Sequence, residues 1–280
     1  MKKTFEDWLI LSDVDGTLHN KLGGLPQRNY EAIRKFTELG GNFTLASGRT
    51  VTCITPAYES VPCNQPAVIL NGAAIYDMKN HRLLSSTPIG EKGMQFVREV
   101  VRRFSGTVYS LDVAIYCADM VYIVRSGMLS QLTLSVDKSP CKTADIDRVP
   151  QEGWLRVIFW GTPQVLRWFS HYIESVPNPD ANFMFSSSFT VEMLQKDVHK
   201  GTGALKLARE LGIRRDHVAG IGDYYNDWDM LKTVGLPACA GQAPRKIQSI
   251  CKYKACHCNR GCVADLIEFI MFRGGGLPQQ

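Results

Sequence analysis

Apolar runs alternate with helical repeats along the first part of the chain. Residues 8–11 form an uninterrupted apolar run, which is typical of a strand buried on both faces of a parallel sheet. Apolar residues then recur at helical spacing over 30–39, and this helix is expected to end at Gly40-Gly41. The runs 43–46 and 67–70 predict two further strands, with a second helix between them. This alternation predicts a doubly wound α/β core.

The pattern changes in the middle of the chain. Between about 83 and 194 there are few strand–helix–strand units, and one helix is predicted over 163–175. Short strands are predicted at 107–109, 120–124, 155–160, 182–185 and 189–194. Such a shift in pattern is typical of an inserted α+β domain rather than of a continuation of the first sheet.

Alternation then resumes. A helical repeat over 202–211 ends at Gly212, an apolar strand follows at 218–221, and strand–helix pairs continue to 272. We therefore expect a mainly parallel, Rossmann-like α/β core made of residues 1–82 and 195–280. Residues 83–194 are expected to form an α+β cap inserted between the two halves of this core.

Composition excludes several classes of protein. The chain has 280 residues, 45% of them hydrophobic and 21% charged, and a net charge of 32 − 27 = +5. Lys and Arg are scattered, so no nucleic-acid partner is expected, and no apolar stretch approaches the ~20 residues of a membrane span. Glu6 and Asp7 interrupt what would be a secretory signal. We expect a cytoplasmic protein, and the sequence says nothing of its oligomeric state.

The nine cysteines are best interpreted as reduced thiols, because their number is odd and no export signal precedes them. Four of them lie close together around His257, namely Cys251, Cys256, Cys258 and Cys262. Zinc sites usually use C-x₂₋₄-C pairs, whereas this group is tighter and has no second pair at a distance. Packing of these cysteines is favoured, and a structural zinc site is the alternative.

Acidic residues follow two of the predicted core strands. Asp13 and Asp15 are two positions apart, so their carboxylates point the same way if the strand geometry continues, and Gly16 then permits a sharp turn. Asp223 and Asp227 follow a second strand. Carboxylates this close repel one another unless they share a proton or a cation, and hard oxygen ligands favour Mg²⁺.

These residue types suit phosphoryl transfer. Asp13 is the natural nucleophile, forming an aspartyl phosphate, and Asp15 the natural general acid and base. The hydroxyl of Ser47 and the backbone N–H groups beside it, at Gly48, can hold the phosphoryl oxygens, while Lys200 adds a positive charge. A mere surface turn is the alternative for the Asp-x-Asp-Gly-Thr segment, but three further elements in order argue against coincidence.

Four segments resemble the motifs of the haloacid dehalogenase-like superfamily: Asp13-Val14-Asp15-Gly16-Thr17-Leu18, Ala46-Ser47-Gly48-Arg49, Lys200-Gly201, and Gly222-Asp223-x-x-Asn226-Asp227-x-x-Met230-Leu231. The segment 69–77 is similar to the entry to the cap in Cof-type, subclass IIB members. The resemblance implies phosphoryl contacts from Ser47, Lys200 and Asn226. It also implies Mg²⁺ on Asp13, the Asp15 backbone carbonyl and Asp223, with Thr17 and Asp227 supporting them.

Two segments depart from the family pattern. Gly241-Gln242-Ala243 stands where the family usually has Gly-Asn-Ala, and the segment 259–263 only loosely resembles the family's usual ending. Arg49 has two interpretations, a clamp for the substrate or an ion pair at the edge of the core.

The function expected from these residues is a Mg²⁺-dependent phosphomonoesterase. Its substrate would be a small phosphorylated metabolite, a sugar phosphate or a phosphorylated cofactor. A phosphomutase of the same superfamily would use the same aspartyl phosphate and is the first alternative. A non-catalytic sensor of a phosphorylated metabolite is a weaker alternative, because none of Asp13, Asp15 and Lys200 is replaced.

Overall fold

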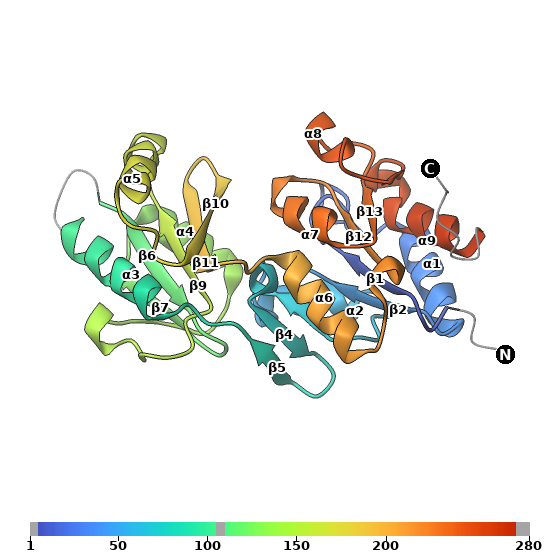
Figure 1. The fold of residues 1–280 in the computed structure, drawn as a ribbon, viewed down its shortest axis with the longest axis horizontal. Helices are drawn as coiled ribbons and strands as arrows, with labels where there is room; N and C mark the ends of the chain where they lie inside the picture. The colour runs from blue at the N-terminus through green and yellow to red at the C-terminus, as the bar shows by residue number, and fades with distance from the viewer. Residues whose placement is uncertain (1–4, 105–109, 273–280) are drawn as a thin grey trace. The chain divides into compact units, whose positions relative to one another are not determined.

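The computed structural model describes residues 5–104 and 110–272. The chain divides into two compact units, one made of Met1–Leu84 and His199–Gln280 and the other of Ser85–Val198 (Figure 1). The roles expected for these parts, a catalytic core and a cap, stay predictions. Over the described residues, no helix combines the length and the apolar character that crossing a bilayer requires.

The first unit is built on a parallel sheet with the strand order β14-β13-β12-β1-β2. Its strands are β1 (Leu9–Ser12), β2 (Asn42–Leu45), β12 (Val218–Gly222), β13 (Leu236–Cys239) and β14 (Tyr253–Lys254). Every residue of β1 is buried, as the continuous apolar run predicts for a strand covered on both faces. The α/β class expected from the sequence is confirmed.

Helices α1 (Gln27–Glu38) and α9 (Cys262–Phe272) pack against each other, and α6 (Lys200–Glu210) packs against α7 (Trp228–Thr233). Apolar residues of α6, Ala204 and Leu207 among them, share a buried cluster with Leu9 and Leu11 of β1. The unit also contains α2 (Val51–Glu59), α8 (Arg245–Gln248) and the 3-10 turns η1 (Leu70–Gly72), η3 (Arg215–His217), η4 (Tyr225–Asp227) and η5 (Cys258–Arg260).

The predicted strand at 67–70 lies in a different sheet from the one expected. Strand β3 (Ala67–Ile69) pairs antiparallel with β4 (Ala74–Asp77) in a three-stranded sheet completed by β5 (Arg82–Ser86). One bridge, between Ala46 and Val68, links it to the end of β2. An apolar run shows that a strand is buried, but not which partner it pairs with.

The turn η1 brings the chain against the beginning of α6. Gly72 has a φ of +95°, and a Cβ atom there would overlap the carbonyl oxygen of His199. Only glycine satisfies both conditions, since other residues rarely adopt this backbone conformation. Gly72 therefore lies directly beside the residue that precedes Lys200.

The second unit contains a six-stranded sheet with the order β10-β11-β9-β6-β7-β8, antiparallel except for the pair β7 and β8. Its strands are β6 (Asp112–Tyr116), β7 (Val121–Arg125), β8 (Cys141–Thr143), β9 (Arg156–Trp160), β10 (Ala181–Ser187) and β11 (Thr190–Gln195). Its helices are α3 (Glu91–Arg103), α4 (Met128–Asp137) and α5 (Pro163–Ser175), with a 3-10 turn η2 (Ile146–Arg148). The α+β pattern expected for the insertion is confirmed.

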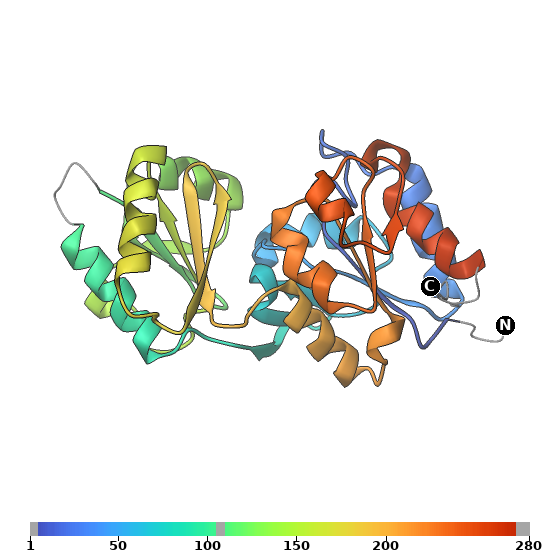
Figure 2. The same cartoon turned by 45° about the horizontal axis from the view of Figure 1, so that its top comes forward.

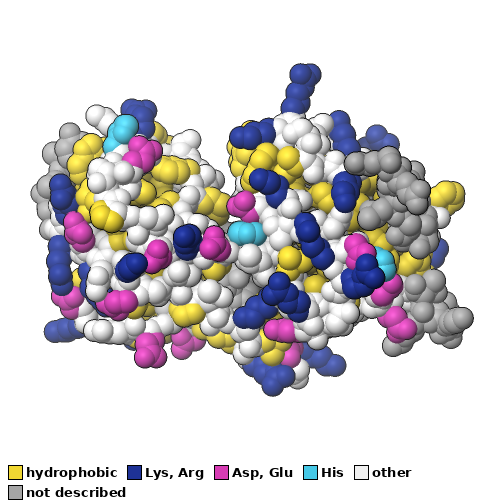
Figure 3. Space-filling view, in the orientation of Figure 1, with side chains coloured by type: hydrophobic (Ala, Val, Ile, Leu, Met, Phe, Trp, Pro, Cys, Tyr) yellow, Lys and Arg dark blue, Asp and Glu magenta, His cyan; other side chains and the backbone are white. Residues whose placement is uncertain are grey.

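Helices α3 and α5 cover one face of this sheet (Figure 2). Their apolar residues, such as Val97 and Phe169, pack with alternate residues of the strands, such as Val157 and Phe159. The predicted strand at 107–109 lies outside the described residues. On the face drawn in Figure 3, Lys and Arg side chains are interspersed with Asp and Glu rather than gathered in one stripe.

Candidate active site

The predicted site residues of the core follow the carboxyl ends of adjacent parallel strands. Asp13 comes directly after β1 and Asp223 directly after β12, and these two strands pair in parallel with Ser12 opposite Ile221. Ser47 follows β2 on the other side of β1. Ends of neighbouring parallel strands meet at one edge of a sheet, which is where open α/β folds place their ligands.

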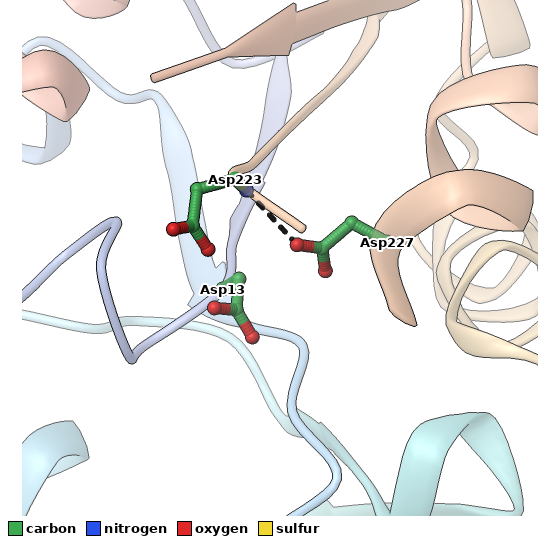
Figure 4. A group of neighbouring side chains, drawn as sticks. All are labelled: Asp13, Asp223 and Asp227. Atoms are coloured by element: carbon green, nitrogen blue, oxygen red, sulfur yellow. Dashed lines mark hydrogen bonds between the residues drawn. The ribbon is translucent and has the colours of Figure 1, made fainter. Parts of the chain in front are cut away.

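Three carboxylates meet at this edge. One oxygen from each of Asp13, Asp223 and Asp227 lies within 4.8 Å of the others (Figure 4). Asp227 is fully buried, and its Oδ2 accepts hydrogen bonds from the backbone N–H groups of Asp223 at 3.0 Å and Tyr224 at 3.3 Å. Asp227 thereby closes the turn that presents Asp223.

Lys200 is the cation of this cluster. Its Nζ lies 2.6 Å from Oδ1 of Asp13 and 2.7 Å from Oδ1 of Asp227, and only 1% of the residue is exposed. The side chain is aimed by the beginning of α6, where the His199 Nδ1 accepts a hydrogen bond from the N–H of Gly201. The structure thus brings Lys200 beside Asp13, although the two residues are 187 positions apart in the chain.

The acidic cluster has perturbed proton affinities. Burial raises the pKa of Asp13 to about 7, and the charge of Asp227 adds to this, while Lys200 opposes it. Burial and the charge of Asp227 raise the pKa of Asp223 to about 6. Burial alone would lower the pKa of Lys200, but the two carboxylates outweigh it and raise that pKa above its usual value. The buried carboxylates therefore need more positive charge than Lys200 supplies.

The donor set fits a divalent cation. Asp227 uses one oxygen for Lys200 and the other for backbone N–H groups, so it shapes the cluster rather than offering a ligand. Asp13 and Asp223 each keep an oxygen outside their bonds to Lys200 and Gln242. Two carboxylates with hard oxygen atoms, already desolvated, are what Mg²⁺ takes alongside water and phosphate oxygens.

Asp15 lies differently from the arrangement expected for continued strand geometry. Strand β1 ends at Ser12, and the Asp15 side chain is 69% exposed and outside the acidic cluster. Arg49 donates to both of its carboxylate oxygens, from Nη2 at 2.6 Å and from Nε at 3.1 Å. Of the two interpretations of Arg49, the structure shows the ion pair, and a contact with substrate stays a prediction.

The remaining predicted residues lie around the same strand ends. Ser47 is 3% exposed, and its Oγ accepts a hydrogen bond from the N–H of Arg49 at 3.3 Å. Gly48 lies against the side chain of Asn71 in η1. Asn226 is half-buried in the turn η4. Thr17 is fully buried, and its carbonyl oxygen accepts a hydrogen bond from the Cys262 thiol.

Gln242, which from the sequence is only a departure from the family pattern, belongs to the same region. Its Nε2 donates to the carbonyl oxygen of Gly16 at 2.6 Å and lies 3.4 Å from Oδ2 of Asp223. Its position after the fourth motif was the one signal available in the sequence.

The cysteine group lies beside the site without forming a metal centre. Among the described residues, the acidic cluster is the one group of three or more ligand side chains close enough to hold a metal ion. The N–H of Cys258 donates to Gln242, and the Cys262 thiol donates to Thr17. No disulfide joins any of the nine cysteines, all of which lie in the described part of the chain. Cys258 and Cys262 are fully buried here, and whether the group binds zinc stays open.

Curated proteins similar to this chain include named phosphatases. Pyridoxal phosphate phosphatase YbhA of Escherichia coli is 23% identical over 248 residues, covering 86% of this chain and 90% of that protein. The 5-amino-6-(5-phospho-D-ribitylamino)uracil phosphatase YcsE of Bacillus subtilis is 22% identical over 88% of each chain.

Solved structures show the same fold. A haloacid dehalogenase-like hydrolase from Bacteroides thetaiotaomicron superposes with a TM-score of 0.78 at 21% identity, over 94% of this chain and 99% of that one. A subclass IIB sugar phosphatase superposes with a TM-score of 0.77 at 14% identity, over 96% and 100%. The family model for haloacid dehalogenase-like hydrolases matches residues 10–267. The chain therefore belongs to the haloacid dehalogenase-like hydrolases, as its four motifs predict.

Proposed function

We propose that this protein is a Mg²⁺-dependent phosphomonoesterase that acts on a small phosphorylated metabolite through an aspartyl-phosphate intermediate. The observation that carries the proposal is the buried pair of Asp13 and Lys200, 2.6 Å apart, beside Asp223. Lys200 favours the ionised form of Asp13, which is the nucleophilic form, and a bound cation would favour it further. The relatives YbhA and YcsE are both named phosphatases of small phosphorylated compounds.

Asp13 and Asp223 would hold the cation, together with the backbone carbonyl of Asp15. When bound, Mg²⁺ supplies the positive charge that lets a phosphate dianion approach these carboxylates. Two like unit charges 4 Å apart repel by about 4 kcal/mol at an effective dielectric of about 20, so without added charge the approach is unfavourable. Asp227 would support the site by holding Lys200 and the turn that carries Asp223.

Asp13 would attack the phosphorus atom through one of its carboxylate oxygens. The bond between phosphorus and the leaving-group oxygen breaks, and Asp15 gives that oxygen its proton. Asp15 then takes a proton from water, whose oxygen attacks the phosphorus of the aspartyl phosphate. Inorganic phosphate leaves, and Asp13 returns to its first state. The exposure of Asp15 gives it access to both the leaving group and water.

Ser47, the N–H of Gly48 and Asn226 would contact the phosphoryl oxygens, and Thr17 would support the turn after β1. Hydrogen-bond donors fixed before the reaction stabilise the charge that develops on these oxygens. Arg49 would contact the substrate once its bond to Asp15 opens.

Residues 83–194 would select the leaving group, while residues 1–82 and 195–280 carry out the chemistry. Named relatives and similar structures include phosphatases for a cofactor, pyridoxal phosphate, and for a sugar phosphate, so both substrate classes belong in the test. A reducing compartment, the cytoplasm, suits a chain whose nine cysteines form no disulfide.

The test is release of inorganic phosphate from a panel of sugar phosphates and phosphorylated cofactors, with Mg²⁺ and with a chelator. We expect wild type and Asp229→Asn, a change at an exposed acid in α7, to release phosphate only with Mg²⁺. Asp13→Asn should release none while keeping its fold. Turnover by Asp13→Asn would contradict the proposal, and conversion of a hexose phosphate to its isomer without phosphate release would assign a mutase instead.

A further inference from the structure

Gln242 lies between the two loops that carry the acidic residues. It follows β13 and reaches the loop after β1 through the carbonyl oxygen of Gly16, at 2.6 Å. The same Nε2 lies 3.4 Å from Oδ2 of Asp223, in the loop after β12. One amide group therefore touches both loops, although Gly16 and Gln242 are 226 positions apart in the chain.

The orientation of this amide is fixed from its other end. Oε1 of Gln242 accepts a hydrogen bond from the N–H of Cys258 at 3.0 Å. A backbone N–H can only donate, so it must face the amide oxygen, and the NH₂ group must then face Gly16 and Asp223. An exchange of the oxygen and the nitrogen would break every one of these contacts.

The backbone that carries Gln242 is also held. The N–H of Gly241 donates to the carbonyl oxygen of Cys256 at 2.9 Å, and Gln248 Nε2 donates to the carbonyl oxygen of Ala243 at 2.7 Å. These bonds hold both neighbours of Gln242, so its side chain extends from a fixed point. A hydrogen bond from a side chain held in this way to a metal-ligating side chain orients that ligand.

The two loops approach each other closely at this point. Gly16 has a φ of +75°, and a Cβ atom there would lie 2.5 Å from Oδ2 of Asp223. The Asp223 carboxylate thus packs against bare backbone, and the NH₂ group of Gln242 contacts both the Gly16 carbonyl and this carboxylate. Motion of either loop would change the direction in which Asp223 points.

We propose that Gln242 is a positioning residue that fixes the Asp223 carboxylate against the Gly16 loop in the orientation that receives the divalent cation. The inference rests on the proposed function for the identity of that cation. The family's usual asparagine at this position is shorter by one methylene, about 1.3 Å of reach. From the held backbone of residue 242, the amide of such a side chain falls short of the N–H of Cys258 and the carbonyl of Gly16, so this site fits glutamine.

The test compares wild type with Gln242→Met, which keeps the length and volume but lacks the amide, and with Gln242→Asn. Gln65→Leu is the matched control, because Gln65 is another half-buried glutamine of the first unit whose amide bonds Asn42 instead. Binding of Mn²⁺ to the substrate-free protein is measured by electron paramagnetic resonance. Thermal unfolding, and kcat and KM at several Mg²⁺ concentrations, are measured on the same samples.

We expect both Gln242 variants to bind Mn²⁺ about 10- to 100-fold more weakly than wild type, as is usual when a residue behind a metal ligand is lost. Gln65→Leu should bind Mn²⁺ like wild type. The Mg²⁺ concentration for half-maximal turnover should rise in the Gln242 variants, while KM for the phosphorylated substrate and kcat at saturating Mg²⁺ stay within a few fold. A purely structural role would lower the unfolding temperature but leave the Mn²⁺ affinity of the folded protein unchanged.

Mn²⁺ affinity within twofold of wild type in folded Gln242→Met would overturn the inference, as would an equal loss in Gln65→Leu. Wild-type affinity in Gln242→Asn would overturn the argument from reach. If wild type binds Mn²⁺ but hydrolyses no phosphomonoester, the proposed function fails alone, and the comparison of Mn²⁺ affinities still decides the role of Gln242. If wild type binds no divalent cation, both fail together.

Discussion

Replacing Lys200 with methionine tests the centre of the proposed site. Methionine has nearly the same length, so the change removes the ammonium group while leaving little empty space. The side chain of Lys200 is 0% exposed, and its Nζ contacts Asp13 and Asp227 at 2.6 and 2.7 Å. Its loss leaves two buried carboxylates facing each other with no compensating charge.

The magnitude follows from these distances. At an effective dielectric of about 20, unit charges 2.6 Å apart attract by about 6 kcal/mol, and the cost of burying the ions offsets part of this. Measured losses for removing one partner of a buried pair are about 3–5 kcal/mol. We expect the free energy of unfolding of Lys200→Met to fall by that amount at neutral pH. Turnover should fall by about 10²–10³, because the charge no longer stabilises the transition state.

Urea unfolding in the presence of a chelator measures the stability change, and phosphate release with Mg²⁺ measures the turnover. Lys206→Met is the matched control, since Lys206 lies on the same helix and takes part in no ion pair among the described residues. The double variant Lys200→Met/Asp227→Asn should be more stable than Lys200→Met alone, because a neutral amide then replaces one of the two carboxylates that have lost the ammonium group.

Two results would refute this reasoning. One is a loss in Lys200→Met of less than about 1 kcal/mol, the range of an exposed ion pair. The other is a double variant that is less stable than Lys200→Met, since that would show that the carboxylates do not repel each other once the ammonium is gone.

Three further outcomes are expected. Asp15→Asn should slow release of the leaving group from an alkyl phosphate far more than from p-nitrophenyl phosphate, whose leaving group needs no proton; equal slowing of that first step in single-turnover measurements would contradict a role as general acid. Burial raises the pKa of Asp13 from 3.8 to about 7, so the free energy of unfolding of the metal-free protein should fall by up to about 4 kcal/mol as pH rises from 4 to 7. Urea unfolding at each pH should show a smaller fall for Asp13→Asn. Equal pH profiles would argue against the raised pKa. Gly72→Ala should lower the unfolding temperature and the turnover together, since its methyl group displaces His199; a variant that melts and turns over like wild type would contradict the tight approach.

The positions of Asp13 and Asp223 could be predicted because continuous apolar runs mark buried parallel strands, and the residue after such a strand lies at a known edge. Lys200 could be placed beside them only because it comes just before a predicted helix, between the insertion and the strand that precedes Asp223. The direction of the Asp15 side chain could not be predicted, because it depends on β1 ending at Ser12 rather than two residues later. The pairing of β3 likewise depends on partners that an apolar run does not specify.

The second unit was harder to predict for a different reason. Helices α3 and α5 cover only part of one face of its sheet. Its strands therefore combine buried and exposed positions. Strand β6 escaped prediction although four of its five residues are buried. Helix α4 exposes Met128, Leu132 and Val136, so its apolar residues do not mark the core side. Short apolar runs of this kind do not separate helix from strand.

The contact of Gly72 with His199 also sets where the chain can be cut and rejoined. Lys200 lies two residues after the boundary at Val198–His199, yet the turn at Gly72 fixes the beginning of its helix to the first unit. A chimera that exchanges Ser85–Val198 for the corresponding insertion of a relative therefore keeps Asp13, Lys200 and Asp223 together in the first unit. The chain is suited to grafting of new specificities, provided that both junctions lie between Gly72 and His199, so that both residues are kept.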